Sequence, residues 1–141
     1  MSGGTLIVTA GRGVNNDITI RRQGGVVLVS DAAAELRTAA PCKPSSQGGA
    51  ECPVPTAVQA NGQDGDDAST VSPNLDAPAT LYGGSGKDQL NGGPHADRLV
   101  GDEGTDTLDA VDGVSANDSL DGGLAIDSCA RDTGDTMVNC P

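Results

Sequence analysis

An aspartate returns every nine residues in the stretch GGSGKDQLNGGPHADRLVGDEGTDTL, which runs from Gly83 to Leu108. Each of these aspartates has a glycine five residues before it and a leucine two residues after it. They are Asp88, Asp97 and Asp106. The spacing slips by three residues at 112–115 and then returns with Asp118 and Asp127. Because one short unit cannot bury its own apolar side, such a repeat predicts a solenoid in which successive units stack.

The leucine of each unit indicates where the core lies. A nine-residue unit divides into about six residues of loop and about three of strand, and strand side chains alternate between the two faces. Only the middle strand residue then points inward, which selects Leu90, Leu99, Leu108 and Leu120. The expected outward neighbours are Gln89, Asn91, Arg98, Val100, Thr107 and Asp109. A stack of leucines would fill a flat interior in a chain that has no Trp, no Phe and a single Tyr.

The charge of the chain limits its partners. It has 20 acidic and 8 basic residues among 141, a formal net charge of −12. Such a surface repels nucleic acid and anionic membranes and attracts cations. No stretch approaches the roughly 20 apolar residues of a membrane span. High charge with few aromatic residues is also typical of disorder, so an alternative is a chain that stays disordered until its charge is neutralised.

Stacked repeats would bring aspartate carboxylates close together at the edge of the solenoid. Loops on one edge would bring their aspartates about 4.8 Å apart, the spacing of strands, and bare carboxylates at that distance repel. A divalent cation that takes six or more oxygen ligands would relieve the repulsion, because glycine leaves backbone carbonyls accessible. Calcium tolerates an irregular cage better than magnesium does. The sequence therefore predicts several Ca²⁺ ions bound between loops.

The units GGSGKDQLN and GDEGTDTLD resemble the hemolysin-type, or RTX, calcium-binding nonapeptide. The similarity extends over residues 83–130 and is partial over 62–70, and residues 121–140 resemble the ending of secreted actinobacterial members. The resemblance implies a right-handed parallel β-roll. In that fold two nonapeptides make one turn, and each ion lies between loops two repeats apart on the same edge.

The resemblance also implies a set of ligands. Asp88 would share an ion with Asp106, Asp97 with Asp118, and Asp106 also with Asp127. Asp67 would be a further ligand without a clear partner, although its turn at 61–67 is more typical of an ordinary acidic loop. The implied carbonyl ligands belong to Gly83, Ser85, Gly92, Pro94, Gly101, Asp102, Glu103, Gly104, Gly123 and Ala125. The insertion at 112–115 and the neighbouring Pro94 and His95 predict a weaker Asp97–Asp118 site. His95 itself is expected to be an exposed loop residue.

Four cysteines lie in two close pairs, Cys42 with Cys52 and Cys129 with Cys140. An even number in an acidic chain with few core residues favours disulfides and an oxidising, extracellular setting. Three connectivities are possible, and local pairing is the simplest. A zinc site of four thiolates is the alternative, but it usually needs CxxC pairs, which this sequence lacks.

The chain is expected to form a single all-β solenoid domain over 1–141. Residues 5–82 would form irregular strands, at 5–9, 17–20, 26–30 and within 56–82, with a disulfide loop at 42–52 and one helical turn at 32–37. Residues 62–70 (GQDGDDAST) are a weaker copy of the repeat, and 11–19 (GRGVNNDIT) are a distant echo that carries Asp17. Residues 83–130 would be the repeats.

The end of the chain, 131–141, would form a disulfide-linked cap. Cys129 takes an inward position, and a bridge to Cys140 would fold Met137 and Val138 over the open end of the stack. At the other end, MSGG does not resemble a signal peptide, and we expect a natural export signal to have been removed.

The sequence offers no constellation for catalysis. It contains one histidine and no HExxH, GxSxG or phosphate-binding loop, and acidic pairs such as Asp66–Asp67 lack the aromatic cleft of a glycosidase. We therefore predict a monomeric extracellular module that folds or is stabilised on binding calcium, with a structural or adhesive role. One alternative is the tail of a larger secreted enzyme or toxin. Another is an ice- or ligand-binding solenoid, which the mixed outward side chains disfavour.

Overall fold

Residues 3–31, 37–38 and 41–141 are described by the structure, a computed structural model of the chain. They form strands and turns, and none of them belongs to a helix long and apolar enough to cross a membrane. Sheet A has seven strands, in the order β15 (Thr136–Val138), β13 (Ser119–Asp121), β11 (Arg98–Glu103), β9 (Ala79–Ser85), β7 (Pro55–Asp64), β1 (Gly3–Thr9) and β4 (Arg37–Thr38). Sheet B has eight, in the order β14 (Ser128–Ala130), β12 (Thr107–Asp109), β10 (Gln89–Asn91), β8 (Ala68–Val71), β2 (Asp17–Gln23), β3 (Val26–Asp31), β6 (Ala50–Pro53) and β5 (Lys43–Pro44).

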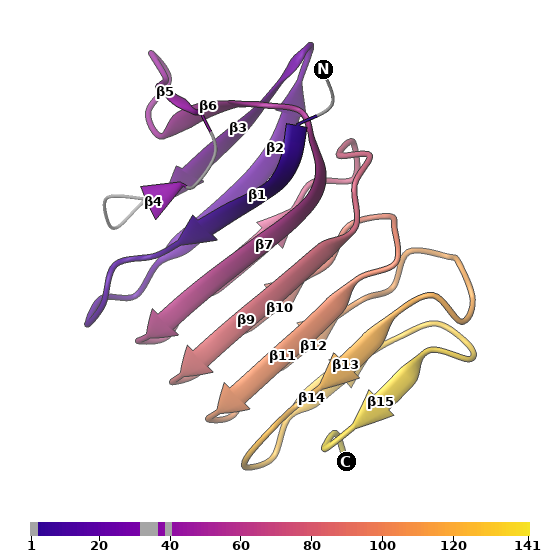
Figure 1. Cartoon of the computed structure of the whole chain (residues 1–141). Coiled ribbons are helices and arrows are strands. Elements are labelled where there is room, and N and C mark those ends of the chain that lie inside the picture. Colours follow the sequence, from indigo (N-terminus) through magenta and orange to yellow (C-terminus); the bar gives the residue numbers. More distant parts are fainter. Residues whose placement is uncertain (1–2, 32–36, 39–40) are drawn as a thin grey trace.

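From β7 onward the chain alternates between the two sheets, and each strand pairs in parallel with the next strand of its own sheet. The result is a stack of flattened coils that runs down the molecule toward the C-terminus (Figure 1). The predicted all-β solenoid is confirmed. Its coils follow the nine-residue repeat, because one strand and one bend together use one repeat.

The N-terminal part joins the same stack. β1 pairs in parallel with β7, and β2 pairs in parallel with β8, so these two strands form a first coil. β3 and β6 then extend sheet B in antiparallel fashion. The strands predicted at 5–9, 17–20 and 26–30 are confirmed. The helical turn predicted at 32–37 lies largely outside the described residues, and Arg37 belongs to β4.

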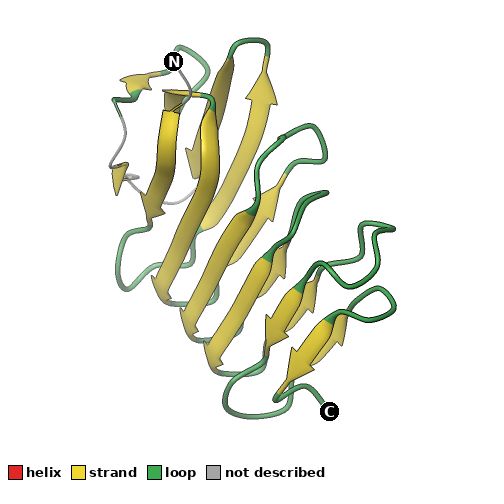
Figure 2. Cartoon of the chain, turned by 45° about the vertical axis from the view of Figure 1, so that its right-hand side comes forward, coloured by secondary structure: helices red, strands yellow, loops and turns green. Residues whose placement is uncertain are grey.

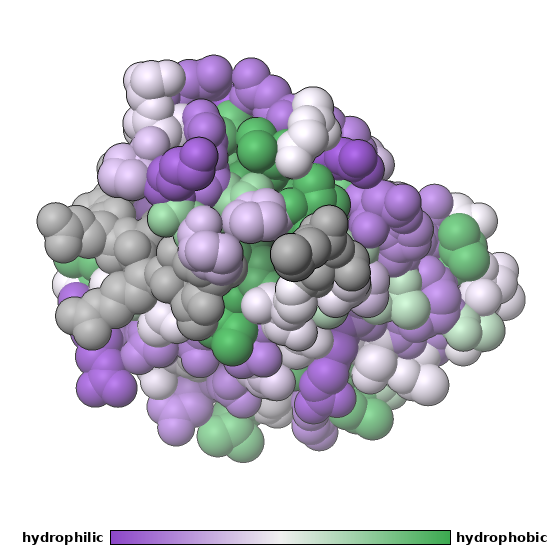
Figure 3. Space-filling view, turned by 45° about the horizontal axis from the view of Figure 1, so that its top comes forward, coloured by the Kyte–Doolittle hydropathy of each residue, from purple (hydrophilic) through white to green (hydrophobic). Residues whose placement is uncertain are grey.

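Inward side chains of the two sheets form the core. In sheet A the column in register is Val8, Ala60, Leu81, Leu99, Leu120 and Met137. In sheet B it is Ile18, Ser69, Leu90, Leu108 and Cys129. The four leucines predicted to point inward are at most 1 % exposed, which confirms the prediction. On the face shown in the space-filling view, hydrophilic residues cover much of the surface, with apolar residues near the centre and a few at the rim (Figure 3).

One outward prediction is wrong. Val100 was expected to face solvent but is 6 % exposed. It lies in register between Tyr82 of β9 and Asp121 of β13 on the outer face of sheet A, so its neighbours cover it. The other predicted outward residues of β10 and β12 are exposed or partly exposed.

Both local disulfides are present, Cys42–Cys52 and Cys129–Cys140, and no free cysteine remains for the alternative zinc site. The second bridge joins β14 of sheet B to the residue two positions after β15 of sheet A. It therefore links the last strands of the two sheets covalently. Met137 is in register with Leu120, whereas Val138, predicted to lie over the end of the stack, is 54 % exposed.

Ser69 interrupts the inward column of sheet B, and its buried hydroxyl has no hydrogen-bond partner. Replacing Ser69 by alanine removes this unpaired group and is expected to raise the free energy of unfolding by about 1 kcal/mol. Leu90 occupies the same column on the adjacent strand, so Leu90→Ala is the matched control and should lower that free energy by about 2–5 kcal/mol. Urea unfolding measures both, and a less stable Ser69→Ala variant would contradict the prediction.

Candidate metal site

The bends between the sheets stack into two edges of the roll (Figure 2). The first edge carries the bends that lead from sheet A to sheet B, at residues 10–16, 62–67, 83–88, 101–106 and 122–127. The second edge carries those that lead back, at residues 71–78, 92–97, 110–118 and 131–135. Several bends begin within the last residues of a strand.

The predicted ligands divide unequally between the edges. The first edge holds Asp67, Gly83, Ser85, Asp88, Gly101, Asp102, Glu103, Gly104, Asp106, Gly123, Ala125 and Asp127. The second edge holds Gly92, Pro94, Asp97 and Asp118. The expected spatial pairs of aspartates are brought together, as the hydrogen bonds of each edge show.

A ladder of hydrogen bonds links the aspartates of the first edge. The backbone N–H of Asp67 donates to Oδ1 of Asp88, and that of Asp88 donates to Oδ1 of Asp106, both at 2.8 Å. The N–H of Asp106 donates in the same way to Asp127 at 2.8 Å. Each carboxylate therefore takes a fixed place against the bend of the preceding coil.

These carboxylates are buried, which the sequence did not indicate. Asp67, Asp88, Asp106 and Asp127 are at most 5 % exposed. In each of them the second oxygen, Oδ2, is buried and has no hydrogen-bond partner. A buried carboxylate oxygen without a donor is costly, so each one calls for a cation or a proton.

Glycine at the start of each bend makes room for the unpaired oxygen. A β-carbon on Gly101 would collide with Oδ2 of Asp106 and with the carbonyl oxygen of Gly122 in the next coil. A β-carbon on Gly62 would likewise collide with Oδ2 of Asp67 and with the carbonyl oxygen of Gly83. A carboxylate oxygen and a carbonyl oxygen thus converge on the same glycine, the oxygen chemistry that calcium prefers.

Other predicted carbonyls already accept hydrogen bonds between coils. The carbonyl of Ser85 accepts from Gly65 N–H at 2.9 Å, and that of Glu103 accepts from Gly86 N–H at 2.8 Å. The carbonyl of Asp102 accepts from the N–H of Leu124 at 2.7 Å. Each of these oxygens keeps one lone pair, so it could still contact an ion.

The charge environment agrees with a cation-seeking site. Burial, together with the nearby carboxylates of Asp106 and Asp67, raises the pKa of Asp88 to about 7, although the hydrogen bond from Asp67 N–H lowers it. Burial raises the pKa of Asp97 to about 6. Burial also raises the pKa values of Asp67, Asp106 and Asp118, against hydrogen bonds that lower them.

These shifts predict an unusual pH dependence for the calcium-free protein. A carboxyl whose folded pKa lies above its unfolded value near 3.8 favours folding when protonated. That contribution is present in full below 3.8 and is lost as the pH rises through about 6 to 7. The unfolding temperature of dialysed, calcium-free protein should therefore be higher at pH 5 than at pH 8. Calorimetric scans measure it, and an unfolding temperature that rises with pH across this range would contradict the expectation.

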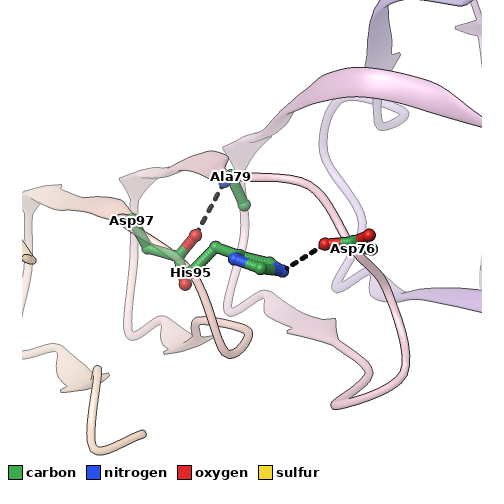
Figure 4. Close-up of polar contacts among 4 residues, drawn as sticks. All are labelled: Asp76, Ala79, His95 and Asp97. Carbon is green, nitrogen blue, oxygen red and sulfur yellow. Dashed lines mark hydrogen bonds and ion pairs between the residues drawn. The ribbon is translucent and has the colours of Figure 1, made fainter. Parts of the chain in front are cut away.

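The second edge has a similar ladder, but its Asp97 has a donor at each carboxylate oxygen, whereas Oδ2 of Asp118 is buried without a partner. The N–H of Asp97 donates to Oδ1 of Asp118 at 2.7 Å, so the insertion at 112–115 does not break the register. Asp97 itself accepts from Ala79 N–H at 2.7 Å through Oδ1 and from Gly93 N–H at 2.6 Å through Oδ2. Figure 4 shows the bond from Ala79 to Asp97. Both oxygens of Asp97 are thus occupied by backbone donors.

Sequence reasoning missed two members of the ladders. Asp135 ends the second ladder, with Oδ1 accepting from Asp118 N–H at 3.2 Å and Oδ2 accepting from Asp132 N–H at 2.8 Å. Burial acts to raise the pKa of Asp135, but these backbone donors lower it overall. Asn16 begins the first ladder, two residues before the inward Ile18, in the place that Asp17 was expected to hold. Asn16 N–H donates to Oδ1 of Asp67 at 2.7 Å. The spacing of 17 residues from Asp118 to Asp135 was the available signal.

His95 pairs with a surface carboxylate. Its Nε2 lies 2.9 Å from Oδ1 of Asp76 in the neighbouring bend (Figure 4). Within the described ranges, no three His, Cys, Asp or Glu side chains lie close enough together to hold a metal ion. An ion in this roll would therefore need backbone carbonyl oxygens beside one or two carboxylates.

Comparison with protein families fits this arrangement of glycine bends and buried aspartates. Residues 79–108 match the RTX calcium-binding nonapeptide repeat, in four copies. The segment is an RTX calcium-binding repeat. No curated protein and no solved structure matches the chain significantly. The matched RTX segment spans β9 to β12 and contains Asp88, Asp97 and Asp106.

Proposed function

We propose that this chain is an extracellular, calcium-binding RTX β-roll module whose fold is stabilised by several Ca²⁺ ions. The observation that carries the proposal is the set of buried, unpartnered Oδ2 atoms on the first edge. They belong to Asp67, Asp88, Asp106 and Asp127. Bound calcium would supply the positive charge that these oxygens lack.

The residues of the first edge fit calcium better than they fit smaller ions. Each Oδ2 faces the glycine that opens its own bend, and carbonyl oxygens of the next coil face the same glycine at Gly62 and Gly101. These are hard oxygen donors in an irregular arrangement, which calcium accepts and magnesium does not. The aspartates hold the ligand oxygen in place through their Oδ1 hydrogen bonds, so that little ordering remains for the ion to impose.

The energy expected from these sites is comparable with the stability of a small domain. With a Kd of about 0.1 mM and extracellular calcium of about 1 mM, each site contributes about 1.4 kcal/mol. Four such sites would contribute about 6 kcal/mol, against a usual total of about 5–15 kcal/mol. At submicromolar calcium, as inside cells, this contribution vanishes. We therefore propose that the roll tightens after export.

Two features support a structural or adhesive role outside the cell. Disulfides such as Cys42–Cys52 and Cys129–Cys140 form and persist in oxidising compartments. The repeated residues, glycine, aspartate and leucine, also lie at structural positions, namely the bends and the core columns. We propose that the module is monomeric and not an enzyme.

Isothermal titration calorimetry tests the proposal directly. Calcium added to the dialysed, disulfide-bonded protein should bind at about four sites with submillimolar affinity, because four Oδ2 atoms on the first edge are buried without a hydrogen-bond partner. Magnesium at the same concentration is the control and should bind much more weakly. An absence of calcium binding, confirmed by equilibrium dialysis, would refute the function.

A further inference from the structure

We infer that calcium binds along one edge only of this β-roll, between Asp67 and Asp127, because elsewhere backbone donors, an amide group or a β-carbon stand where that edge has an unpartnered oxygen facing glycine. The inference rests on the proposed function and narrows it. The RTX resemblance alone implies ions on both edges, including one shared by Asp97 and Asp118. The contacts of the second edge and of the first coil point to a different distribution.

The first argument concerns the residue that opens each bend. On the first edge, from the second coil on, this residue is glycine, at Gly62, Gly83, Gly101 and Gly122. A β-carbon at any of these would collide with Oδ2 of the aspartate in the same bend. On the second edge the equivalent residues are Val71, Gly92, Ala110 and Arg131. Three of those four bends therefore carry a side chain in the place that the first edge keeps open.

The second argument concerns Asp97, whose bend does begin with glycine. Its Oδ1 accepts from Ala79 N–H and its Oδ2 accepts from Gly93 N–H. An ion at this Oδ2 would have to share the oxygen with the Gly93 donor, whereas Oδ2 of Asp88 or Asp106 on the first edge has no donor to share with. Asp97 thus acts as a backbone clamp between β9 and the bend that leads into β11 (Figure 4).

Asp135 closes the second edge in the same way. Its Oδ1 and Oδ2 both accept backbone N–H groups, from Asn117, Asp118 and Asp132. Asp118 lies between these two clamps and retains a buried, unpartnered Oδ2. Its bend, however, begins with the buried Ala110, so a β-carbon stands at the bend position that is glycine on the first edge.

The first coil shows what replaces an ion on the first edge. Asn16 stands where the later coils have aspartate, and its bend begins with Ala10 instead of glycine. The Asn16 side-chain Nδ2 donates to Oδ1 of Asp67 at 2.8 Å. It also lies within hydrogen-bonding distance of the carbonyls of Val14 (3.0 Å), Gly11 (3.1 Å) and Gly62 (3.4 Å). One amide group thus faces the same kinds of oxygen that calcium would bind farther along the edge.

Three Asp→Asn variants test the inference by counting ions. Asp106→Asn removes an unpartnered Oδ2 on the first edge, and calorimetry should show at least one calcium ion fewer than in the wild type. Asp97→Asn and Asp118→Asn are the matched changes on the second edge and should leave the number of ions unchanged. Asp118→Asn removes no hydrogen bond at Oδ2, so it remains informative if Asp97→Asn is too unstable to titrate.

Unfolding temperatures without calcium separate the two kinds of aspartate. Asp97→Asn should unfold at a lower temperature than the wild type, because an amide nitrogen cannot accept from Gly93 N–H. Asp106→Asn should not, because its Oδ2 has no donor to lose and its charge is removed from a crowded acidic edge.

The outcomes distinguish this inference from the proposed function. If Asp118→Asn or a folded Asp97→Asn loses an ion, ions bind on both edges and the inference is wrong, whereas the calcium function stands. If the wild type binds no calcium, the proposed function fails and the inference fails with it. Loss of an ion in Asp106→Asn alone supports both.

Discussion

Removing calcium should lower the unfolding temperature of this protein by roughly 12–24 °C. Four sites that each contribute about 1.4 kcal/mol give about 6 kcal/mol, and 1 kcal/mol shifts the midpoint of a chain of this size by about 2–4 °C. The physical cause is the first edge, where the Oδ2 atoms of four aspartates are buried without a donor and successive aspartates are joined by hydrogen bonds. Without an ion they must either be protonated or bear unscreened repulsion.

Differential scanning calorimetry at pH 7.5 measures this effect. It compares disulfide-bonded protein in about 1 mM calcium, an extracellular concentration, with the same protein in excess chelator. Magnesium replacing calcium at equal ionic strength separates specific binding from general screening of the acidic surface. Far-UV circular dichroism then shows whether strand content falls at intermediate temperature in the chelated sample. Equal unfolding temperatures in calcium and in chelator would contradict the prediction.

The coil geometry could be predicted from the sequence because a solenoid is nearly one-dimensional. Once the period is known, residues one coil apart must stack, and this placed Leu99 beside Leu120 and Asp88 beside Asp106. The same rule survived the insertion, since the ladder continues from Asp97 to Asp118. Neighbour relations between coils therefore follow from spacing alone.

The parts that could not be predicted depend on contacts that spacing does not encode. The hairpins of β2, β3 and β6 carry no repeat, so their antiparallel pairing had no periodic signal. The burial of the aspartates depends on how closely the bends pack, and this became visible only from the hydrogen bonds of Oδ1. Asn16 was missed because the repeat was traced through its aspartates, whereas in the first coil the position two residues before the inward Ile18 is held by asparagine.

The residues that distinguish the two edges are visible in the sequence, but the sequence alone does not show what they do. Ala110 and Arg131 stand where Gly101 and Gly122 stand on the other edge. A sequence reader sees these only as imperfect repeats. Their meaning appears once the structure shows that a side chain at the glycine position would meet the carboxylate of the same bend.

Gly104→Ala should be among the most damaging single changes in the protein. Gly104 has φ +134, a backbone conformation that residues with a β-carbon rarely adopt. A β-carbon there would also collide with the carbonyl oxygen of Gly86 in the preceding coil. Backbone strain of about 1–3 kcal/mol and overpacking of similar size predict a loss of about 3–5 kcal/mol. Chemical denaturation in saturating calcium measures this loss. A loss of less than about 1 kcal/mol, the size of an ordinary single substitution, would show that the bends can move apart to make room for the methyl group.

The matched change in the last bend should have the opposite sign. Ala125 occupies the position equivalent to Gly104, with φ +102, and it is exposed at the end of the stack. Ala125→Gly relieves strain of about 1–3 kcal/mol and costs about 0.5–1 kcal/mol in chain entropy, so a net gain of about 1 kcal/mol is expected. A destabilised Ala125→Gly variant would mean that the last bend differs from the others in backbone shape. A loss of stability in Gly104→Ala and a gain in Ala125→Gly would instead show that both bends require this positive-φ backbone and that alanine is strained in it.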